Sequence, residues 1–274
     1  MNSLTPVQAA TLADEAETLA FVDLYAAAPA ALRDRLGLQV ERVGDTTLLL
    51  APGLPTPMFN RAIGLGLGRA ADLEAVHAVR ERYRQAGVSG WWLHWNPHGT
   101  PSDMPAQLRV LGFTQPPRRS WAKMLRQSNE APRIATDLTV AAAGPAQVGA
   151  VVAAIAAAFE MPPFMADWMA ALHGRPAWRT YAITDATDVV GGGFLFLAGE
   201  LAWLGMGAVA TTHRRRGGQG ALMALRIADA IAAGARLQVT ETGEPISDEP
   251  NPSLANMYRC EFDLVASRLN FVAP

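Results

Sequence analysis

The sequence predicts an α+β protein built from two similar units, each a twisted, mostly antiparallel sheet flanked by helices. Short β-rich runs alternate with segments of helical spacing along the whole chain. The same order of elements occurs twice, and both units end with a helix that runs into a phenylalanine, a bend and a strand, "VLGFTQPPRRSWAKML" and "RCEFDLVASRLNF". The length of 274 residues with 50% hydrophobic content suits two ordinary domains.

The first unit is expected to contain five strands and two helices. Strands are predicted from β-rich runs next to turn residues, and helices from 3.6-residue spacing with glycine stops. The expected strands are 38–44, 46–53, 58–68, 90–95 and 120–125, and the expected helices are 71–87 and 102–113. The polar, proline-containing stretch "QSNEAPR" (127–133) marks the boundary, which gives domains 1–130 and 131–274.

The second unit repeats this order with one addition, a turn rich in arginine and glycine. The expected strands are 138–143, 179–184, 189–199, 201–211, 236–241 and 265–271, and the expected helices are 145–159, 164–172, 221–234 and 252–260. The helix 145–159 is alanine-rich and almost uncharged, but Pro145 and Gln147 near its start favour a buried helix over a membrane span.

Composition excludes several classes of function. The net charge of −2 and the pI near 6.2 indicate neither nucleic acid nor an anionic membrane as a partner. Acidic residues stand near the N-terminus where a signal peptide has basic ones, so a cytoplasmic protein is expected. Cys260 is the only cysteine, and the five histidines are scattered, so neither an internal disulfide nor a metal site is expected. The oligomeric state stays open.

The stretch "HRRRGGQG" (213–220) predicts an anion site. It joins a strand to a helix, whose first amides have no partner inside the helix and attract negative charge. Glycines permit close approach of a ligand, and arginines suit phosphate. A P-loop needs a lysine followed by serine or threonine, and a dinucleotide fold places its glycine turn after the first strand, so coenzyme A is the pyrophosphate compound that remains.

The segments "GMGAVAT", "HRRRGGQG", "ALMALRIADAIAAG", "LQVTE" and "NPSLANMYRCEF", in this order, resemble the GNAT N-acetyltransferase superfamily over residues 134–274. The turn of that family is written Q/R-x-x-G-x-G/A, and this sequence fits it in two registers, Arg215 to Gly220 or Arg214 to Gln219. The first half shows a GNAT-like order of elements without this turn, and its "GLGLGRA" (64–70) is expected to be the end of a strand and a loop. The resemblance therefore implies a tandem protein with a degenerate first copy.

By this resemblance the cofactor is acetyl-CoA, and the acceptor is an amine of a small molecule or a peptide that attacks directly in a ternary complex. The residues expected to bind the coenzyme lie on the strand before the turn, in the turn itself and in the last helix. They are Ala208, Val209, Ala210, Arg214, Arg215, Arg216, Gly217, Gly218, Gln219, Gly220, Ala221, Asn251 and Asn256. Asn251, which precedes a proline, is also expected to cap that helix.

The resemblance implies a tyrosine as the proton donor to the departing thiolate, and Tyr258 lies seven residues after Asn251 as the pattern requires. Phe262 arrives one residue early, so packing of Tyr258 on the sheet is the alternative. Glu241, at the end of a strand, is the candidate general base, and deprotonation through water is the alternative. The acids that follow it, Glu244, Asp248 and Glu249, are expected to be solvated. Phe164, Met165 and Trp168 are candidates to line a pocket for an apolar acceptor.

Two other functions compete with acetyl transfer. A coenzyme A-binding sensor or scaffold would keep the turn and lack the chemistry. A nucleic-acid contact would use the arginines, but the acidic overall charge and the lack of an aromatic, basic face disfavour it.

Overall fold

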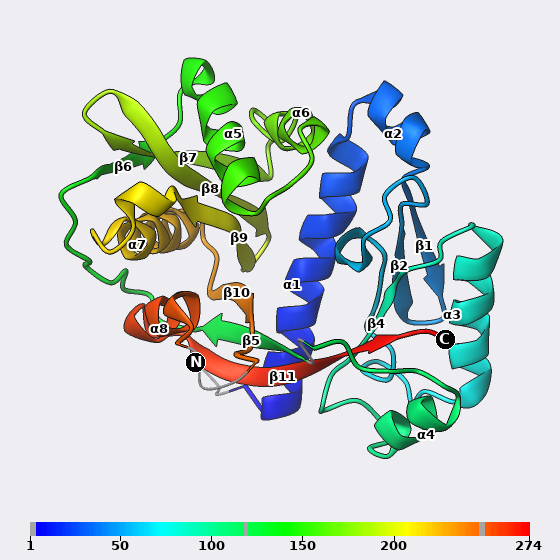
Figure 1. Cartoon of the computed structure of the whole chain (residues 1–274). Helices are drawn as coiled ribbons and strands as arrows, with labels where there is room; N and C mark the ends of the chain where they lie inside the picture. The colour runs from blue at the N-terminus through cyan, green and yellow to red at the C-terminus, as the bar shows by residue number, and fades with distance from the viewer. Residues whose placement is uncertain (1–3, 118–119, 247–249) are drawn as a thin grey trace.

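The computed structural model describes residues 4–117, 120–246 and 250–274. Strands within these ranges form one continuous sheet in the order β1-β2-β3-β4-β11-β5-β10-β9-β8-β7-β6. Neighbouring strands are antiparallel except in the pairs β3–β4 and β9–β10, which are parallel. Helices flank this sheet (Figure 1). The predicted α+β class with a mostly antiparallel sheet is confirmed.

The predicted elements of both halves are present, with ends shifted by a few residues. The first half contains α1 (Pro6–Ala27), α2 (Ala30–Leu36), β1 (Gln39–Val43), β2 (Thr46–Leu50), η1 (Pro57–Phe59), β3 (Arg61–Ile63), α3 (Leu73–Gln85), β4 (Trp92–Trp95), α4 (Met104–Val110) and β5 (Ser120–Arg126). The second half contains β6 (Thr139–Ala142), η2 (Pro145–Gln147), α5 (Val148–Ala158), α6 (Phe164–Ala170), β7 (Trp178–Asp185), β8 (Asp188–Ala198), β9 (Leu201–Val209), η3 (Thr211–His213), α7 (Gly218–Ala232), β10 (Leu237–Gly243), α8 (Pro252–Arg259) and β11 (Asp263–Val272).

Helix α1 was not predicted, and it crosses the middle of the molecule between the two sets of strands (Figure 1). Its start carries a recognisable signal, because Thr5 and Gln8 form a reciprocal capping box with a proline in the first turn. The helix contacts strands of both halves, including β2, β5, β9, β10 and β11. Its alanine-rich face and two buried acids, Asp14 and Glu17, give it almost no amphipathic pattern, which is why periodicity missed it.

The two halves exchange their last strands. β11 lies between β4 and β5, and β5 lies between β11 and β10, so each half completes the sheet of the other. Arg126 on β5 is fully buried and donates hydrogen bonds to the Cys260 carbonyl (3.0 Å) and to Gln238 Oε1 (3.2 Å). The boundary predicted between residues 130 and 131 falls on the connection from β5 to β6, while the sheet runs through both halves.

The two parallel strand pairs occupy equivalent places in the two halves. In the first half α3 connects β3 to β4, and in the second half α7 connects β9 to β10. The turn before α3 is folded against the first half itself: Thr100 N–H donates to the Gly66 carbonyl (2.9 Å), and a Cβ on Gly66 would lie 2.8 Å from the Trp95 ring. Residues 64–70 form a loop after β3, as predicted in part, because the strand expected to continue to residue 68 ends at Ile63.

Among the described residues, no helix combines the length and the hydropathy needed to cross a membrane. Within the same ranges, no group of three histidine, cysteine or acidic side chains is placed to ligate a metal ion.

Candidate functional site

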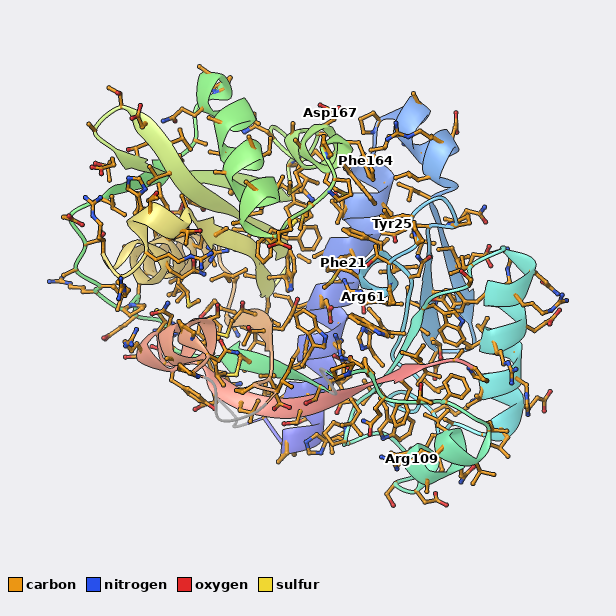
Figure 2. All side chains as sticks on the ribbon, in the orientation of Figure 1. Phe21, Tyr25, Arg61, Arg109, Phe164 and Asp167 are labelled. Carbon is orange, nitrogen blue, oxygen red and sulfur yellow. The ribbon has the colours of Figure 1, made fainter. Side chains whose placement is uncertain are left out.

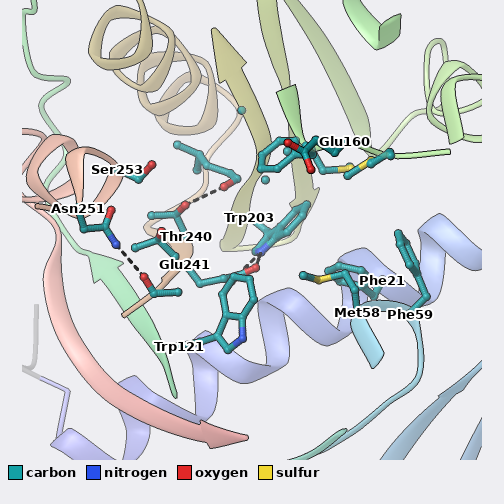
Figure 3. A pocket seen from close by; sticks show the side chains of 18 of the residues that line it. Phe21, Met58, Phe59, Trp121, Glu160, Trp203, Thr240, Glu241, Asn251 and Ser253 are labelled. Atoms are coloured by element: carbon teal, nitrogen blue, oxygen red, sulfur yellow. Dashed lines mark hydrogen bonds between the residues drawn. The ribbon is translucent and has the colours of Figure 1, made fainter. Parts of the chain in front are cut away.

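The site begins where the parallel strands β9 and β10 separate. Their pairing ends at Trp203 and Val239, after which β10 continues beside β5 alone. The diverging strands remain linked by one side chain, because Thr240 Oγ1 donates to the Leu204 carbonyl (2.8 Å; Figure 3). Beyond this point β9 has no paired strand on the β10 side, and two cavities are lined by its residues.

A β-bulge distorts β9 at this opening. The pairing with β8 shifts between Ala208, opposite Gly192, and Gly205, opposite Phe194, so that Met206 and Gly207 together stand opposite one residue of β8 and β9 carries one extra residue. Met206 has a positive φ of 51°, which is uncommon for a residue with a side chain. The bulge re-aims the backbone towards the gap between the strands.

Arg226 of α7 stabilises the bulge by hydrogen bonds to both strands that form it. It is 1% exposed, and its Nη1 donates to the carbonyls of Phe194 (3.0 Å) and Gly205 (3.1 Å). Burial lowers the pKa of its guanidinium to about 10. The two hydrogen bonds link β8 and β9 at the point where their register shifts.

The turn from 213 to 220 leads from β9 into α7 as predicted. Gly217 is the cap of α7 in the left-handed conformation (φ 81°), and Ala221 N–H is the first amide that bonds inside the helix, to the Gly217 carbonyl. The amides of Gly218, Gln219 and Gly220 therefore have no partner within the helix.

The glycines of this turn are required by packing as well as by the backbone. A Cβ on Gly217 would lie 2.2 Å from the Ala135 carbonyl oxygen, and its φ already disfavours a side chain. A Cβ on Gly218 would lie 2.9 Å from Leu138, and one on Gly220 would lie 2.9 Å from Ile134. The glycines thus let α7 start close to the segment before β6.

The three arginines have different surroundings. Arg216 forms ion pairs with Asp185 (2.6 Å) and Asp137 (2.8 Å), which lower the pKa of both carboxyls. Arg214 and Arg215 are exposed and line a cavity of about 820 Å³ in front of the turn. The structure therefore places two of the three arginines where they can meet a ligand.

Most of the predicted coenzyme residues surround this 820 Å³ cavity, which we call the turn cavity. Its lining includes Ala208, Val209, Arg214, Arg215, Gly217, Gly218, Gln219, Gly220 and Asn256. Ala210 and Ala221 do not line it. The Ala210 N–H donates to the Val190 carbonyl, and Ala221 lies within α7.

A second cavity of about 900 Å³ adjoins the first, and we call it the acceptor cavity. Both cavities are lined by Phe159, Gly207, Gln219, Pro252 and Ser253, so they meet at the β9 bulge and the first turn of α8. The acceptor cavity extends from there past Glu241 to α1 and to the segment 54–61 of the first half. Figure 3 shows Ser253 and Asn251 on one side of Trp203 and Glu241, and Phe21, Met58 and Phe59 on the other.

Glu241 projects into the acceptor cavity with 9% of its side chain exposed. Its Oε2 accepts hydrogen bonds from Lys123 Nζ (2.8 Å) and from Trp203 Nε1 (3.1 Å). A carboxylate has about four acceptor positions, so Glu241 retains capacity for an amine or a water.

Glu241 is one end of a buried ionic network centred on α1. Glu17 is fully buried and pairs with Arg61 (2.6 Å), Lys123 (2.8 Å) and Arg268. Burial raises the pKa of Glu17, but the three cations outweigh this effect and hold it well below its usual range. Asp14, one turn earlier, accepts from Arg268 (2.8 Å). The three carboxylates and three cations balance in charge and join β3, β5, β10 and β11 to α1.

The predicted residues of α8 differ in their positions. Asn251 caps the helix as expected, accepting from Leu254 N–H (3.0 Å), and it donates to the Gly243 carbonyl (2.7 Å) at the edge of the acceptor cavity. Tyr258 is 51% exposed and lines neither cavity. Ser253, which the sequence analysis did not single out, lines both.

Of the three residues expected at an apolar pocket, only Met165 lines the acceptor cavity. Trp168 is fully buried and donates to the Leu24 carbonyl (2.7 Å), and Phe164 packs on the guanidinium of Arg35 (4.9 Å). Asp248 and Glu249 lie outside the described residues. Cys260 is buried, and burial raises the pKa of its thiol to about 11.

Sequence reasoning missed the wall of the acceptor cavity that α1 and the first half provide. Arg61 lies over the ring of Phe21, 4.0 Å from its centroid, and Tyr25 donates a hydrogen bond to the Phe59 carbonyl (Figure 2). Only the capping box at Thr5 and the proline and aromatic residues after β2 marked these segments in sequence. Their meeting depends on long-range packing.

No family model and no curated protein matches this sequence. Solved structures do match its fold. A GCN5-related N-acetyltransferase from Kribbella flavida is 16% identical, with a TM-score of 0.69 over 97% of this chain and 95% of that one.

Two further structures agree with it. A GCN5-related N-acetyltransferase from Sphaerobacter thermophilus is 18% identical (TM-score 0.62; 88% and 84% covered), and a tandem GNAT protein from the clavulanic acid biosynthesis pathway is 17% identical (TM-score 0.57; 85% and 80% covered). This chain therefore has the fold of the GCN5-related N-acetyltransferases in a tandem arrangement, as the resemblance of its second half predicted.

Proposed function

We propose that the protein is an acetyl-CoA-dependent N-acetyltransferase that acts on an amine of a small molecule or a peptide, by direct attack in a ternary complex. The observation that carries this proposal is the junction of two cavities at a distorted strand. One cavity has features that suit a pyrophosphate, the other has a carboxylate and apolar walls, and the β9 bulge lies where they meet.

The turn cavity fits the phosphate groups of coenzyme A. The first amides of α7, which have no partner within the helix, and the exposed cations Arg214 and Arg215 provide donors and charge for a pyrophosphate. Ala208 and Val209 on β9 are small enough for a pantetheine arm to lie along the strand, and Asn256 of α8 lines the same cavity. When bound, the coenzyme supplies an activated acetyl thioester.

The chain contributes orientation, electrostatic stabilisation and proton transfer. A backbone amide of the bulge at Met206 and Gly207 can stabilise the negative charge that develops on an acyl oxygen, because it is fixed before the reaction. Glu241 can hold an incoming amine and take its proton, directly or through water. The sharing of this carboxylate with Lys123 fixes its position.

The departing thiolate needs a proton donor, and two hydroxyls on α8 are candidates. Tyr258 is the residue that the family resemblance implies, but its side chain is half exposed and outside both cavities. Ser253 lies at their junction. We therefore propose that Ser253 relays a proton from solvent water to the thiolate, so that its hydroxyl gains one proton from the water as it gives one up.

The test is release of free thiol from acetyl-CoA in the presence of a panel of amines, combined with calorimetry. We expect thiol release that depends on the amine. We also expect one coenzyme A bound per chain, because the turn before α3 is packed against Thr100 and Trp95 of the first half. Tight binding without any thiol release would instead favour the non-catalytic sensor or scaffold, for which the exposed position of Tyr258 is the supporting observation. Failure to bind coenzyme A would contradict both functions.

A further inference from the structure

We propose that the acceptor is a primary amine with one positive charge and an aromatic or aliphatic body, and that the first half of the chain selects it. This inference rests on the proposed acetyl transfer and adds the class of acceptor. It follows from the shape, the lining and the charges of the acceptor cavity.

The acceptor cavity has a polar end and an apolar end. Thr240, Glu241 and Ser253 mark the polar end beside the bulge, and Trp203 separates them from the apolar end (Figure 3). We call the apolar end the apolar compartment; its walls come from α1, from the segment 54–61 and from α6. They include Phe21, Leu24, Leu54, Met58, Phe59 and Met165. An amine held at Glu241 would therefore place its body among these side chains.

The first-half wall of the compartment is rigid. Asn60 is 1% exposed, and its Nδ2 donates to the carbonyls of Leu54 (2.9 Å) and Thr56 (3.1 Å), while its Oδ1 accepts from Ala51 N–H (2.7 Å). Tyr25 ties the same segment to α1 through the Phe59 carbonyl. A wall fixed in this way discriminates between acceptors by shape, since little ordering is needed when a ligand binds.

The charges of the lining favour a single ammonium. Arg61 is neutralised by Glu17 and covered by the Phe21 ring, and Arg226 is engaged with backbone carbonyls. Among the described residues of the lining, the carboxylates are Glu241 at the polar end and Glu160, which is exposed. A second ammonium in the apolar compartment would lose its hydration without a partner, which is costly.

The first experiment compares acceptors by thiol release, using 2-phenylethylamine, ethylamine and spermidine. Because each methylene in an apolar pocket is worth about tenfold or more, we expect kcat/KM for 2-phenylethylamine to exceed that for ethylamine by at least about 100-fold. Spermidine should also be a poorer acceptor than 2-phenylethylamine. Thiol release that is fastest with spermidine, or equal for all three amines, would overturn the inference while leaving acetyl transfer intact.

The second experiment places a polar group in the compartment with Met58→Gln. We expect KM for 2-phenylethylamine to rise by about tenfold, with KM for ethylamine and for acetyl-CoA unchanged, because only the larger amine reaches Met58. Val110→Gln, at a residue 88% exposed on α4, is the matched control. An equal effect on both amines would show that Met58 does not contact the acceptor body.

A readout without turnover separates this inference from the proposed function. Calorimetric titration of the amines into the complex with coenzyme A measures acceptor binding directly. If 2-phenylethylamine binds tightly and Met58→Gln weakens this binding, but no thiol is released, acetyl transfer is contradicted while binding of the amine in the apolar compartment is supported. Preferred binding of spermidine would overturn the compartment whatever the activity.

Discussion

Glu17→Gln removes one charge from the centre of the ionic network and should destabilise the protein strongly. In the parent, Glu17 is fully buried and its two oxygens accept from Arg61, Lys123 and Arg268. Glutamine keeps one acceptor oxygen, but three buried cations then face only Asp14 and Glu241. Breaking a buried pair on one side costs about 3–5 kcal/mol. Taking the lower figure, we expect a melting temperature about 6–12 °C lower, at about 2–4 °C per kcal/mol for a chain of this order of size.

Glu17→Gln should also change how the free energy of unfolding depends on pH. The pKa of Glu17 is held well below its usual range, so its contribution to stability is complete above about pH 4.3, the unfolded value, and is lost as the pH falls towards the folded value. Between pH 4 and pH 3 the free energy of unfolding of the parent should therefore fall more steeply than that of the variant, by up to about 1.4 kcal/mol per pH unit. Burial holds the pKa of His94 well below its ordinary value, and Glu17 opposes this shift, so removal of the Glu17 charge lowers the pKa of His94 further.

Urea unfolding at a series of pH values measures both effects. Glu15→Gln is the matched control, because Glu15 is exposed on the same helix two residues away, and it should change the free energy of unfolding by less than about 0.5 kcal/mol. Equal stability of Glu17→Gln and the parent at pH 7, or parallel slopes below pH 4, would refute the view that Glu17 is the charged centre of the network.

Three further predictions concern the two cavities. Arg215→Met should weaken coenzyme A binding by about tenfold in calorimetry, with a smaller dependence on salt, because Arg215 lines the turn cavity. Arg216→Met should mainly lower the melting temperature, since that arginine is paired with two aspartates. A larger loss of coenzyme A affinity in Arg216→Met than in Arg215→Met would contradict the proposal that Arg215 contacts the coenzyme. Glu241→Gln should lower kcat by about 100-fold or more with coenzyme affinity unchanged, and undiminished turnover would exclude it as the base. Ser253→Ala should lower kcat more than Tyr258→Phe does, because only the serine lines the cavities; the reverse order would restore the tyrosine as proton donor.

The local signals of this sequence predicted its second half well. "RRRGGQG" marked the end of a strand and the start of α7, because glycine conformation and free helix amides are properties of adjacent residues. Asn251 before a proline marked the start of α8 for the same reason. The bulge at Met206 was not predicted, although glycines on both sides of a residue in a strand are its usual sign.

The acceptor side could not be predicted in this way, because it depends on segments that are distant in sequence. Lys123 and Glu241 are 118 positions apart, and Lys123 and Glu17 are 106 apart. They meet only because β5 inserts beside β10 and α1 crosses both strands. Two acids on a helix without an amphipathic pattern look like solvated residues until the three cations that they meet are known.

The strand exchange explains why the degenerate first half is tied to the site of the second half. β5 provides Lys123, the cation that holds Glu241, and it fills the place between β10 and β11. Arg61 and the segment 54–61 come from the same half, and they join the second half through Glu17 and Phe21 of α1. The first half, whose turn before α3 lacks the arginine-glycine sequence, thus still fixes the carboxylate and the apolar wall of the acceptor cavity. Substitutions at Lys123, at Arg61 or in the segment 54–61 are therefore expected to alter the acceptor cavity, although all these residues belong to the first half.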